Sequence, residues 1–370
     1  MHISVERHRS GMAAAILSGR VPAMLAVLCV LGSAVTAGAA PKIAKAGNDA
    51  PGAPAEYKIT PFDPPGSTTT TAAGINASGS IAGYYVDGSD AAHGFVRAAD
   101  GSFTIFDTPG SCCTFTSSID NPGEIAGYDS YNGVYQGFRR TAAGKISTFN
   151  PSGSLVTLVT SVNGGVIVGY YYDGSAYHGF VRAADGEITA FDPSGSTGTF
   201  PAGTAMGLVA GDYQYEQCCA VSHGFVRAVD GTVTTFDPPG SVNTLVNGIN
   251  SAGAIVGSYQ DSEENYHGYV RTPDGSFTTF DPAGSTSTSP AGIGGGGQIT
   301  GWYTDRSDVR HGFVRGPRGV ITTFDPPGST ETTPTSISGG TVTGYYLDGS
   351  GVQHGFVRVF VPCADACAAE

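Results

Sequence analysis

Downstream of Tyr57 the chain alternates short apolar and β-branched runs with clusters of Gly, Asp, Asn and Pro. Residues 80–86, for example, read Ser-Ile-Ala-Gly-Tyr-Tyr-Val, and residues 103–107 read Phe-Thr-Ile-Phe-Asp. These runs have the length of strands, and no stretch shows the 3.6-residue period of an amphipathic helix. The Asp-Gly segments between them favour tight hairpins, because glycine readily adopts the positive φ values of such turns. The pattern therefore predicts an all-β chain.

Two motifs recur through this region at a nearly constant spacing of 42 to 45 residues. The first, His-Gly-Phe-Val-Arg or a variant of it, begins at His93, Gln136, His178, His223, His267, His311 and His354. The second, Phe-Asp-Pro-Pro-Gly-Ser or a variant of it, begins at Phe62, Phe106, Phe149, Phe191, Phe236, Phe280 and Phe324. A four-stranded meander of about 44 residues cannot bury both of its faces alone, so the copies must pack side by side. The repeat predicts a seven-bladed β-propeller of four-stranded antiparallel blades.

The second motif begins ahead of the first, and this offset indicates how the two ends of the chain meet. The last copy, from His354 to Val361, has no Phe-Asp-Pro-Pro strand after it, whereas Tyr57 to Phe62 precedes the first full copy. We expect the N-terminal strand to complete the last blade, which would leave no incomplete sheet edge. The propeller is expected to occupy residues 57–362, between a flexible linker at 40–56 and a C-terminal tail at 363–370.

The first 39 residues resemble a secretory signal peptide. Basic residues precede an apolar run from Val21 to Val35, and Ala37-Gly38-Ala39 supplies a small-x-small cleavage site. The run is short and Gly/Ala-rich for a membrane span, and an uncleaved anchor is the alternative to a signal peptide. We expect the protein to be secreted or periplasmic, with no membrane span after cleavage.

Charge narrows the choice of partners. The whole chain has a formal net charge of −13, and removal of residues 1–39 would leave 15 basic and 30 acidic residues, or −15. Seven of those 15 positive charges are the arginines of the first motif. Nucleic acid binding depends on Lys and Arg that neutralise phosphates, so a nucleic acid partner is not expected.

Six cysteines remain after cleavage, in the pairs Cys112 with Cys113, Cys218 with Cys219, and Cys363 with Cys367. An even number in an exported chain favours disulfides, including bonds between neighbours, but the spacing does not choose among the pairings. Neither adjacent pair has the spacing of a structural zinc site. Calcium in the Asp-Gly-Ser turns is a lesser alternative, because each turn offers few carboxylates. We expect no metal and no cofactor.

The repeated residues are interpreted as parts of the fold. A histidine present in six of seven copies is expected to bond to backbone or to a neighbouring carboxylate in each blade. The motif arginines, such as Arg97, are expected to face the aspartates of the second motif, either as cross-strand pairs or beside capped turns. Phe95 and its equivalents are expected to fill the core, and the tyrosines equivalent to Tyr85 to support it.

The alternation of Gly-Ile-Asn, a Gly-Tyr strand, His-small-Phe and a short hairpin resembles the HAF repeats of bacterial exported proteins. The resemblance covers residues 57–361 and departs from the family pattern in two ways. Glycine, as at Gly94, replaces the middle alanine in every copy that keeps the histidine, and the second copy has Gln136 instead of histidine. The resemblance implies an extracellular repeat protein and no particular chemistry.

Departures from the repeat are where a ligand site is expected. The fourth to sixth copies add aromatic and acidic residues to the loops of one face, and these form the candidate ligand site: Tyr213, Tyr215, Glu216, Asp261, Glu263, Glu264, Trp302 and Asp305. Aromatic faces stack on sugars and carboxylates accept hydrogen bonds from hydroxyl groups, so the set favours a glycan. Solvated loop charge is the plain alternative.

These patterns predict a monomeric binding or interaction module for glycans, other cell-surface polymers or a surface protein. The alternative is a glycosidase or lyase that uses two loop carboxylates. Glu263 and Glu264 are neighbours, so on a strand their side chains would point to opposite faces, and no compact catalytic motif is present. No catalytic residue is therefore assigned.

Overall fold

The computed structural model describes residues 56–215 and 221–361, which contain 28 strands and no helix. The all-β prediction is confirmed for this part of the chain. No helix capable of crossing a membrane occurs in the described residues. The expected signal peptide, nearly all of the linker, and the C-terminal tail lie outside them.

The strands follow the sequence repeat, and we number the repeat units 1 to 7 in chain order. In unit 1, β2 (Ser67–Ile75), β3 (Ile81–Asp87), β4 (Ala92–Arg97) and β5 (Phe103–Phe106) pair consecutively as an antiparallel meander. The strands of units 2 to 4 are β6 (Cys113–Ile119), β7 (Ile125–Tyr131), β8 (Val134–Arg140), β9 (Ile146–Phe149); β10 (Val156–Asn163), β11 (Val166–Tyr172), β12 (Tyr177–Arg182), β13 (Ile188–Phe191); and β14 (Gly198–Ala205), β15 (Leu208–Gln214), β16 (Ser222–Arg227), β17 (Val233–Phe236).

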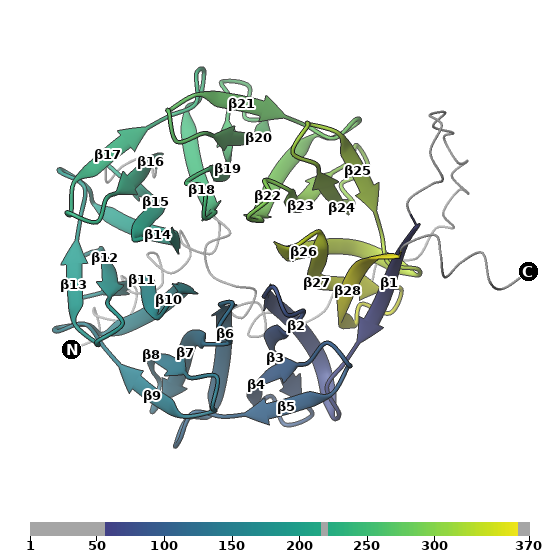
Figure 1. Cartoon of the computed structure of the whole chain (residues 1–370), viewed down its shortest axis with the longest axis horizontal. Coiled ribbons are helices and arrows are strands. Elements are labelled where there is room, and N and C mark those ends of the chain that lie inside the picture. The colour runs from purple at the N-terminus through teal and green to yellow at the C-terminus, as the bar shows by residue number, and fades with distance from the viewer. Residues whose placement is uncertain (1–55, 216–220, 362–370) are drawn as a thin grey trace, which may run out of the picture. The chain divides into compact units, whose positions relative to one another are not determined.

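Units 5 and 6 consist of β18 (Asn243–Ile249), β19 (Ile255–Gln260), β20 (Tyr266–Arg271), β21 (Phe277–Phe280), and of β22 (Ser287–Ile293), β23 (Ile299–Thr304), β24 (Arg310–Arg315), β25 (Ile321–Phe324). Unit 7 comprises β26 (Ser329–Ser338), β27 (Thr341–Asp348) and β28 (Gln353–Val361), with β1 (Glu56–Phe62) paired to β28. Each of three eight-stranded sheets joins two units through a single parallel residue pair, and unit 7 forms a separate four-stranded sheet. Figure 1 shows the units side by side around a central opening.

The N-terminal strand lies where the offset of the motifs places it. β1 runs antiparallel to β28 over its whole length, with Phe62 opposite Gly355. Units 7 and 1 are also joined near the opening, because Thr335 donates a hydrogen bond of 2.8 Å to the carbonyl of Ala72. Gln353 adds a second link through its side-chain amide, which donates to the carbonyl of Thr70. The two ends of the repeat array are therefore adjacent.

The core lies between neighbouring units. We call the fourth strand of each unit its outer strand; in unit 7 this is β1. Phe95, Ile81 and their equivalents are fully buried, and the cluster around Phe95 and Ile81 of unit 1 includes Phe62 from the outer strand of the adjacent unit 7. The rings of Phe62 and Phe95 meet edge to face, with centroids 6.1 Å apart. Such contacts explain why one meander is insufficient, since each buries its apolar face only against the next.

The glycine that follows the histidine position of the first motif has a steric cause. A Cβ added to Gly94 would lie 2.6 Å from two ring atoms of Phe106, which belongs to the paired outer strand. The same approach recurs at Gly137 and Gly355, with Phe149 and Phe62 respectively. Alanine at this position would force the aromatic ring of the outer strand to move.

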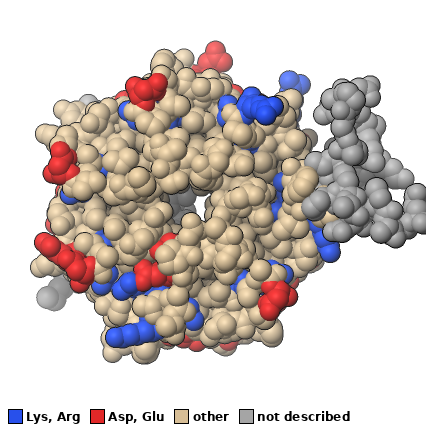
Figure 2. All heavy atoms as spheres, viewed as in Figure 1, with Lys and Arg blue, Asp and Glu red and all other residues tan. Residues whose placement is uncertain are grey.

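Charged side chains are dispersed over the face of the molecule shown in Figure 2. Around the central opening, the face shown in Figure 2 consists mostly of residues other than Lys, Arg, Asp and Glu, and charges lie mainly toward the rim. Among the described residues visible on that face, Lys and Arg do not form a continuous basic track of the kind that follows a nucleic acid backbone.

Candidate functional site

The turns after the second strand of each unit and the turns that lead to the next unit lie at the same end of the strands. The parallel pair Ala92 and Cys113 shows this, because it places the start of β4 beside the start of β6. We call this end the turn face and define it by the connections β3–β4, β5–β6 and their equivalents. It contains the motif histidines and most of the candidate ligand residues.

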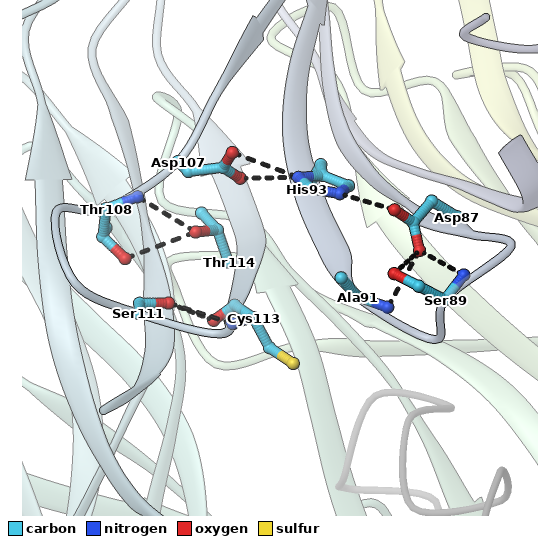
Figure 3. Close-up of polar contacts among 9 residues, drawn as sticks. All are labelled: Asp87, Ser89, Ala91, His93, Asp107, Thr108, Ser111, Cys113 and Thr114. Atoms are coloured by element: carbon cyan, nitrogen blue, oxygen red, sulfur yellow. Dashed lines mark hydrogen bonds and ion pairs between the residues drawn. The ribbon is translucent and has the colours of Figure 1, made fainter. Parts of the chain in front are cut away.

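The histidine of unit 1 is held between two aspartates, as Figure 3 shows. His93 Nδ1 lies 3.0 and 3.1 Å from the two carboxylate oxygens of Asp107, and Nε2 lies 3.3 Å from Oδ2 of Asp87. The ring of Tyr85 packs beside the imidazole, with centroids 5.1 Å apart. Asp87 also closes its own turn by accepting hydrogen bonds from Ser89 and from the backbone N–H of Ala91.

The same arrangement recurs around the turn face. In units 3 to 7, Nδ1 of the histidine lies 2.7 or 2.8 Å from the aspartate of the outer strand, in the pairs His178–Asp192, His223–Asp237, His267–Asp281, His311–Asp325 and His354–Asp63. The turn aspartate approaches Nε2 in four of these units, in the pairs His178–Asp173, His267–Asp261, His311–Asp305 and His354–Asp348. The expectation that histidine bonds to a neighbouring carboxylate is confirmed in all six copies.

The outer-strand aspartate also joins adjacent units. Asp63, which directly follows β1 of unit 7, accepts a hydrogen bond of 2.6 Å from Thr70 in β2 of unit 1. Equivalent bonds run from Thr199 to Asp192, from Thr244 to Asp237, from Thr288 to Asp281 and from Thr332 to Asp325. These threonines are fully buried. Each such carboxylate therefore fixes the histidine of its own unit and the inner strand of the next.

Four of the motif histidines have a raised pKa. Burial lowers the pKa of His93, but the hydrogen bonds and charges of Asp107 and Asp87 outweigh burial and raise the pKa above its ordinary value of 6.5. In His178, His267 and His354, too, burial lowers the pKa and two aspartates raise it, and the net shift is upward. Hydrogen bonds from Ser89 and Ala91 lower the pKa of Asp87 to about 2.

The motif arginines differ from expectation. The Arg97 guanidinium lies 4.9 Å from the ring centroid of Phe62, an outer-strand residue of the preceding unit, and all seven motif arginines stack in this way at 4.8 to 5.1 Å. No motif arginine forms an ion pair with an outer-strand aspartate among the described residues. The predicted Arg–Asp pairing is wrong, because histidine already holds the carboxylate and the arginine projects toward the neighbouring unit.

Unit 2 departs from this arrangement at four positions together. Asp129, Tyr131, Gln136 and Asn150 stand where unit 1 has Tyr85, Asp87, His93 and Asp107. Asp129 is fully buried, and its Oδ1 accepts a hydrogen bond of 3.0 Å from Gln136 Nε2. Burial raises the pKa of Asp129, while the hydrogen bond from Gln136 and the nearby Thr108 side chain act in the opposite direction. In unit 1 the third-strand residue His93 bonds to Asp107, which follows the outer strand. In unit 2 the equivalent Gln136 bonds instead to Asp129 on β7.

Unit 2 also differs at the opposite end of its strands. Arg139 occupies a position that is valine in the other six units, such as Val96 in unit 1, and its guanidinium pairs with Glu124. Asp120 lies in the same turn, where its two carboxylate oxygens accept the backbone N–H groups of Glu124 and Gly164. Burial is the main cause that raises the pKa of Asp120.

Three of the predicted ligand residues belong to the regular arrangement. Tyr213 is buried and packs beside His223, as Tyr85 does beside His93. Asp261 and Asp305 close their turns and approach the motif histidines of units 5 and 6. These side chains are already engaged in the fold.

The remaining predicted residues are placed as follows. Tyr215 is 54% exposed and stands where unit 1 has the turn aspartate, with its ring against Gly195. Glu263 and Glu264 are exposed in the β19–β20 turn. Trp302 is partly buried in β23, and the Arg310 guanidinium lies over its ring at 4.7 Å from the centroid. The same guanidinium lies 3.9 Å from the Glu331 carboxylate. Glu216 lies outside the described residues.

The predicted residues thus occupy three successive units and do not meet at one point in the part of the chain described. The sequence reasoning missed Tyr131, Asp129 and Gln136 as a set. When the repeat units are aligned by their strands, the four replacements in unit 2 fall on the positions of His93 and of the three residues that contact it in unit 1. The loss of the histidine alone does not reveal this.

Cys112 and Cys113 are free thiols near the start of β6, and Cys112 Sγ lies 3.4 Å from the carbonyl of Ser130. The other four cysteines of the expected mature chain are not among the described residues. Within those residues, no group of three His, Cys, Asp or Glu side chains is arranged to hold a metal ion.

Comparison with known proteins places the fold. No family model and no curated protein matches the chain. Among solved structures, virginiamycin B lyase from Staphylococcus aureus is similar at a TM-score of 0.55 and 15% identity, over 82% of this chain and 100% of that one. The β-propeller domain of the Trilobed protease from Pyrococcus furiosus gives 0.56 and 10%, over 82% and 99%.

The BP39L lectin from Burkholderia pseudomallei gives a TM-score of 0.53 and 11% identity, over 80% of this chain and 96% of the lectin. Identities this low establish a common fold and do not transfer an activity. The chain therefore has a propeller fold like that of these proteins.

Proposed function

We propose that this protein is a secreted, seven-bladed β-propeller of the HAF-repeat type that binds glycans or other cell-surface polymers through its turn face. Seven copies of the repeat, four strands in each unit and the pairing of β1 with β28 support the blade count. The leader sequence supports export.

The observation that carries the binding proposal is the exposed ring of Tyr215 in place of a turn aspartate. In unit 1 the equivalent Asp87 is engaged by its turn and by His93, whereas unit 4 has at this position a tyrosine that is 54% exposed. Glu263 and Glu264 extend from the corresponding turn of the next unit. An aromatic face with carboxylates on the same surface suits a sugar, whose C–H face stacks on the ring while its hydroxyl groups donate to the carboxylates.

The enzyme alternative has less support. The motif histidines are engaged with aspartates in all six copies, so they already serve the fold. Asp120 is a carboxyl whose pKa burial raises, as a general acid requires, and Glu124 lies in the same turn. Both oxygens of Asp120 accept backbone N–H groups, however, which favours a role in the turn.

A titration of the full chain with soluble glycans, followed by the fluorescence of Trp302, tests the proposal. Trp302 is the only tryptophan, so a saturable change reports an event at or near unit 6. We expect Tyr215→Ala to weaken binding by about tenfold, the effect of removing one stacking residue. Phe360→Ala is the matched control, because it removes an equally exposed ring from β28. Binding that is unchanged in Tyr215→Ala would contradict the proposed site.

A further inference from the structure

The four replaced residues of unit 2 lie together. In unit 1, the equivalent His93 is within 3.3 Å of both aspartates and packs against Tyr85, so this position contacts the other three. The strand pairing is the same in unit 2, where Gln136 lies opposite Asp129 as His93 lies opposite Tyr85. Two rings are thus replaced by a carboxamide and a carboxylate, which are smaller and more polar.

Tyr131 stands at the exposed edge of this group. Its side chain is 46% exposed, and a Cβ built on Gly110 would lie 3.0 Å from its ring, so one edge of the ring is seated on the turn between units 1 and 2. Tyr215 is seated on Gly195 in the same way, at 2.9 Å. The two units that lack the turn aspartate therefore present the same exposed aromatic ring.

Asp129 provides an independent indication of a ligand. It lies two residues before Tyr131 on β7, so both side chains leave the same face of the strand. Asp129 is fully buried, and among the described residues its Oδ2 has no hydrogen-bond partner. A buried acceptor without a partner is costly, and a donor from a ligand would remove that cost. Thr108, in the turn that seats Tyr131, is the next polar neighbour.

We infer that unit 2 contains a second sugar-binding site, in which Tyr131 stacks on a sugar ring while Gln136, Asn150 and Asp129 bind its hydroxyl groups. This inference rests on the proposed function and adds a site distinct from that at Tyr215. The four side chains include one carboxylate and no cation, so a neutral or amino sugar suits them better than a uronic acid. Two sites two units apart would let one polymer chain be held at two points, which increases its apparent affinity.

The test replaces the four divergent residues of unit 2 by those that unit 1 has at the same positions. The quadruple variant Asp129→Tyr, Tyr131→Asp, Gln136→His, Asn150→Asp carries the residues of unit 1 and is expected to retain the fold. The probes are cellohexaose, chitohexaose, xylohexaose and laminarihexaose, titrated into the full chain by calorimetry. We expect the quadruple variant to lose one binding site per chain, or at least about tenfold in affinity. Tyr215→Asp, which makes the equivalent change in unit 4, should leave that site intact.

The outcomes are distinguishable. If a probe binds parent and quadruple variant equally while Tyr215→Asp weakens binding, the second site is overturned and the proposed function stands. If no probe binds the parent, both fail. Thermal unfolding checks the quadruple variant, and should it unfold early, Tyr131→Ala replaces it, with the same loss expected and unchanged binding as the contrary result.

Discussion

Units 1 and 2 have the same strand pairing and the same buried phenylalanine, yet they use the turn face differently. Unit 1 fills it with an imidazole held between Asp87 and Asp107. Unit 2 has no imidazole there; it has the buried Asp129 on β7 and, two residues further along the strand, the exposed Tyr131. The comparison teaches that side chains repeated in most units hold neighbouring units together, while unit 2 keeps its core and changes the four positions of the turn face together.

The two units also differ away from the turn face. Val96 of unit 1 is replaced in unit 2 by Arg139, and Ser80 by Glu124, with which the arginine pairs. A charged side chain at this position requires its partner, because burying a lone charge is costly. At each end of unit 2, therefore, the replaced side chains pair with one another: Arg139 with Glu124, and Gln136 with Asp129.

The largest expected effect tests what the two units share. Phe95→Ala and Phe138→Ala each remove a fully buried ring, and each should lower the free energy of unfolding by about 3 to 5 kcal/mol. Chemical denaturation of both variants measures this. A loss at Phe138 of less than half that at Phe95 would show that the core of unit 2 is not equivalent.

The ion pair of unit 2 should respond as a matched set. Arg139→Val alone leaves Glu124 mostly buried without its partner and is expected to cost about 2 kcal/mol, less than for a fully buried pair because the arginine is partly exposed. Adding Glu124→Ser gives the residues of unit 1 and should recover most of the loss. A double variant no more stable than the single one would contradict the pairing.

The pH dependence of stability should separate the units as well. The pKa of His93 is raised on folding, so its stabilising contribution is complete below pH 6.5 and is lost as the pH rises through the raised pKa. The pKa of Asp87 is lowered to about 2, so its contribution is complete above its ordinary pKa of 3.8 and is lost as the pH falls toward 2. Stability should therefore be greatest between these ordinary values.

Denaturation midpoints at about pH 5 and about pH 8 measure this effect, with a decrease expected at the higher pH. His93→Gln should make the decrease smaller, because it removes an imidazole whose pKa is raised on folding. An equal decrease in parent and His93→Gln would show that this histidine does not contribute.

Much of the architecture follows from spacing alone. A period near 44 residues and the offset of the Phe-Asp-Pro-Pro motif place Tyr57 to Phe62 beside the last copy. The last copy has no Phe-Asp-Pro-Pro strand after it, and Tyr57 to Phe62 is the strand of this kind that precedes the first copy. The role of Arg97 could not be obtained in this way. Its partner, Phe62, belongs to the preceding unit, and strand patterns within one repeat do not show which residues of adjacent sheets meet.

The candidate site was harder to predict for a related reason. Asp261 and Asp305 look like surplus acidic residues when loops of unequal length are compared by eye, yet their strand positions make them regular turn aspartates. Tyr131, followed by Asn132 and Gly133, reads as part of an ordinary hairpin turn. Its significance depends on Asp129 and Gln136, whose proximity follows from the strand register.

One reciprocal exchange tests the division between fold and binding most directly. His93→Gln places the residue of unit 2 in unit 1, and Gln136→His does the reverse; both the unfolding free energy and the affinity for the glycan probe are measured for each variant. We predict that His93→Gln lowers stability by about 1 kcal/mol and leaves affinity unchanged, while Gln136→His lowers affinity and changes stability less. The opposite pattern, with affinity lost at His93 and unaffected at Gln136, would contradict the account.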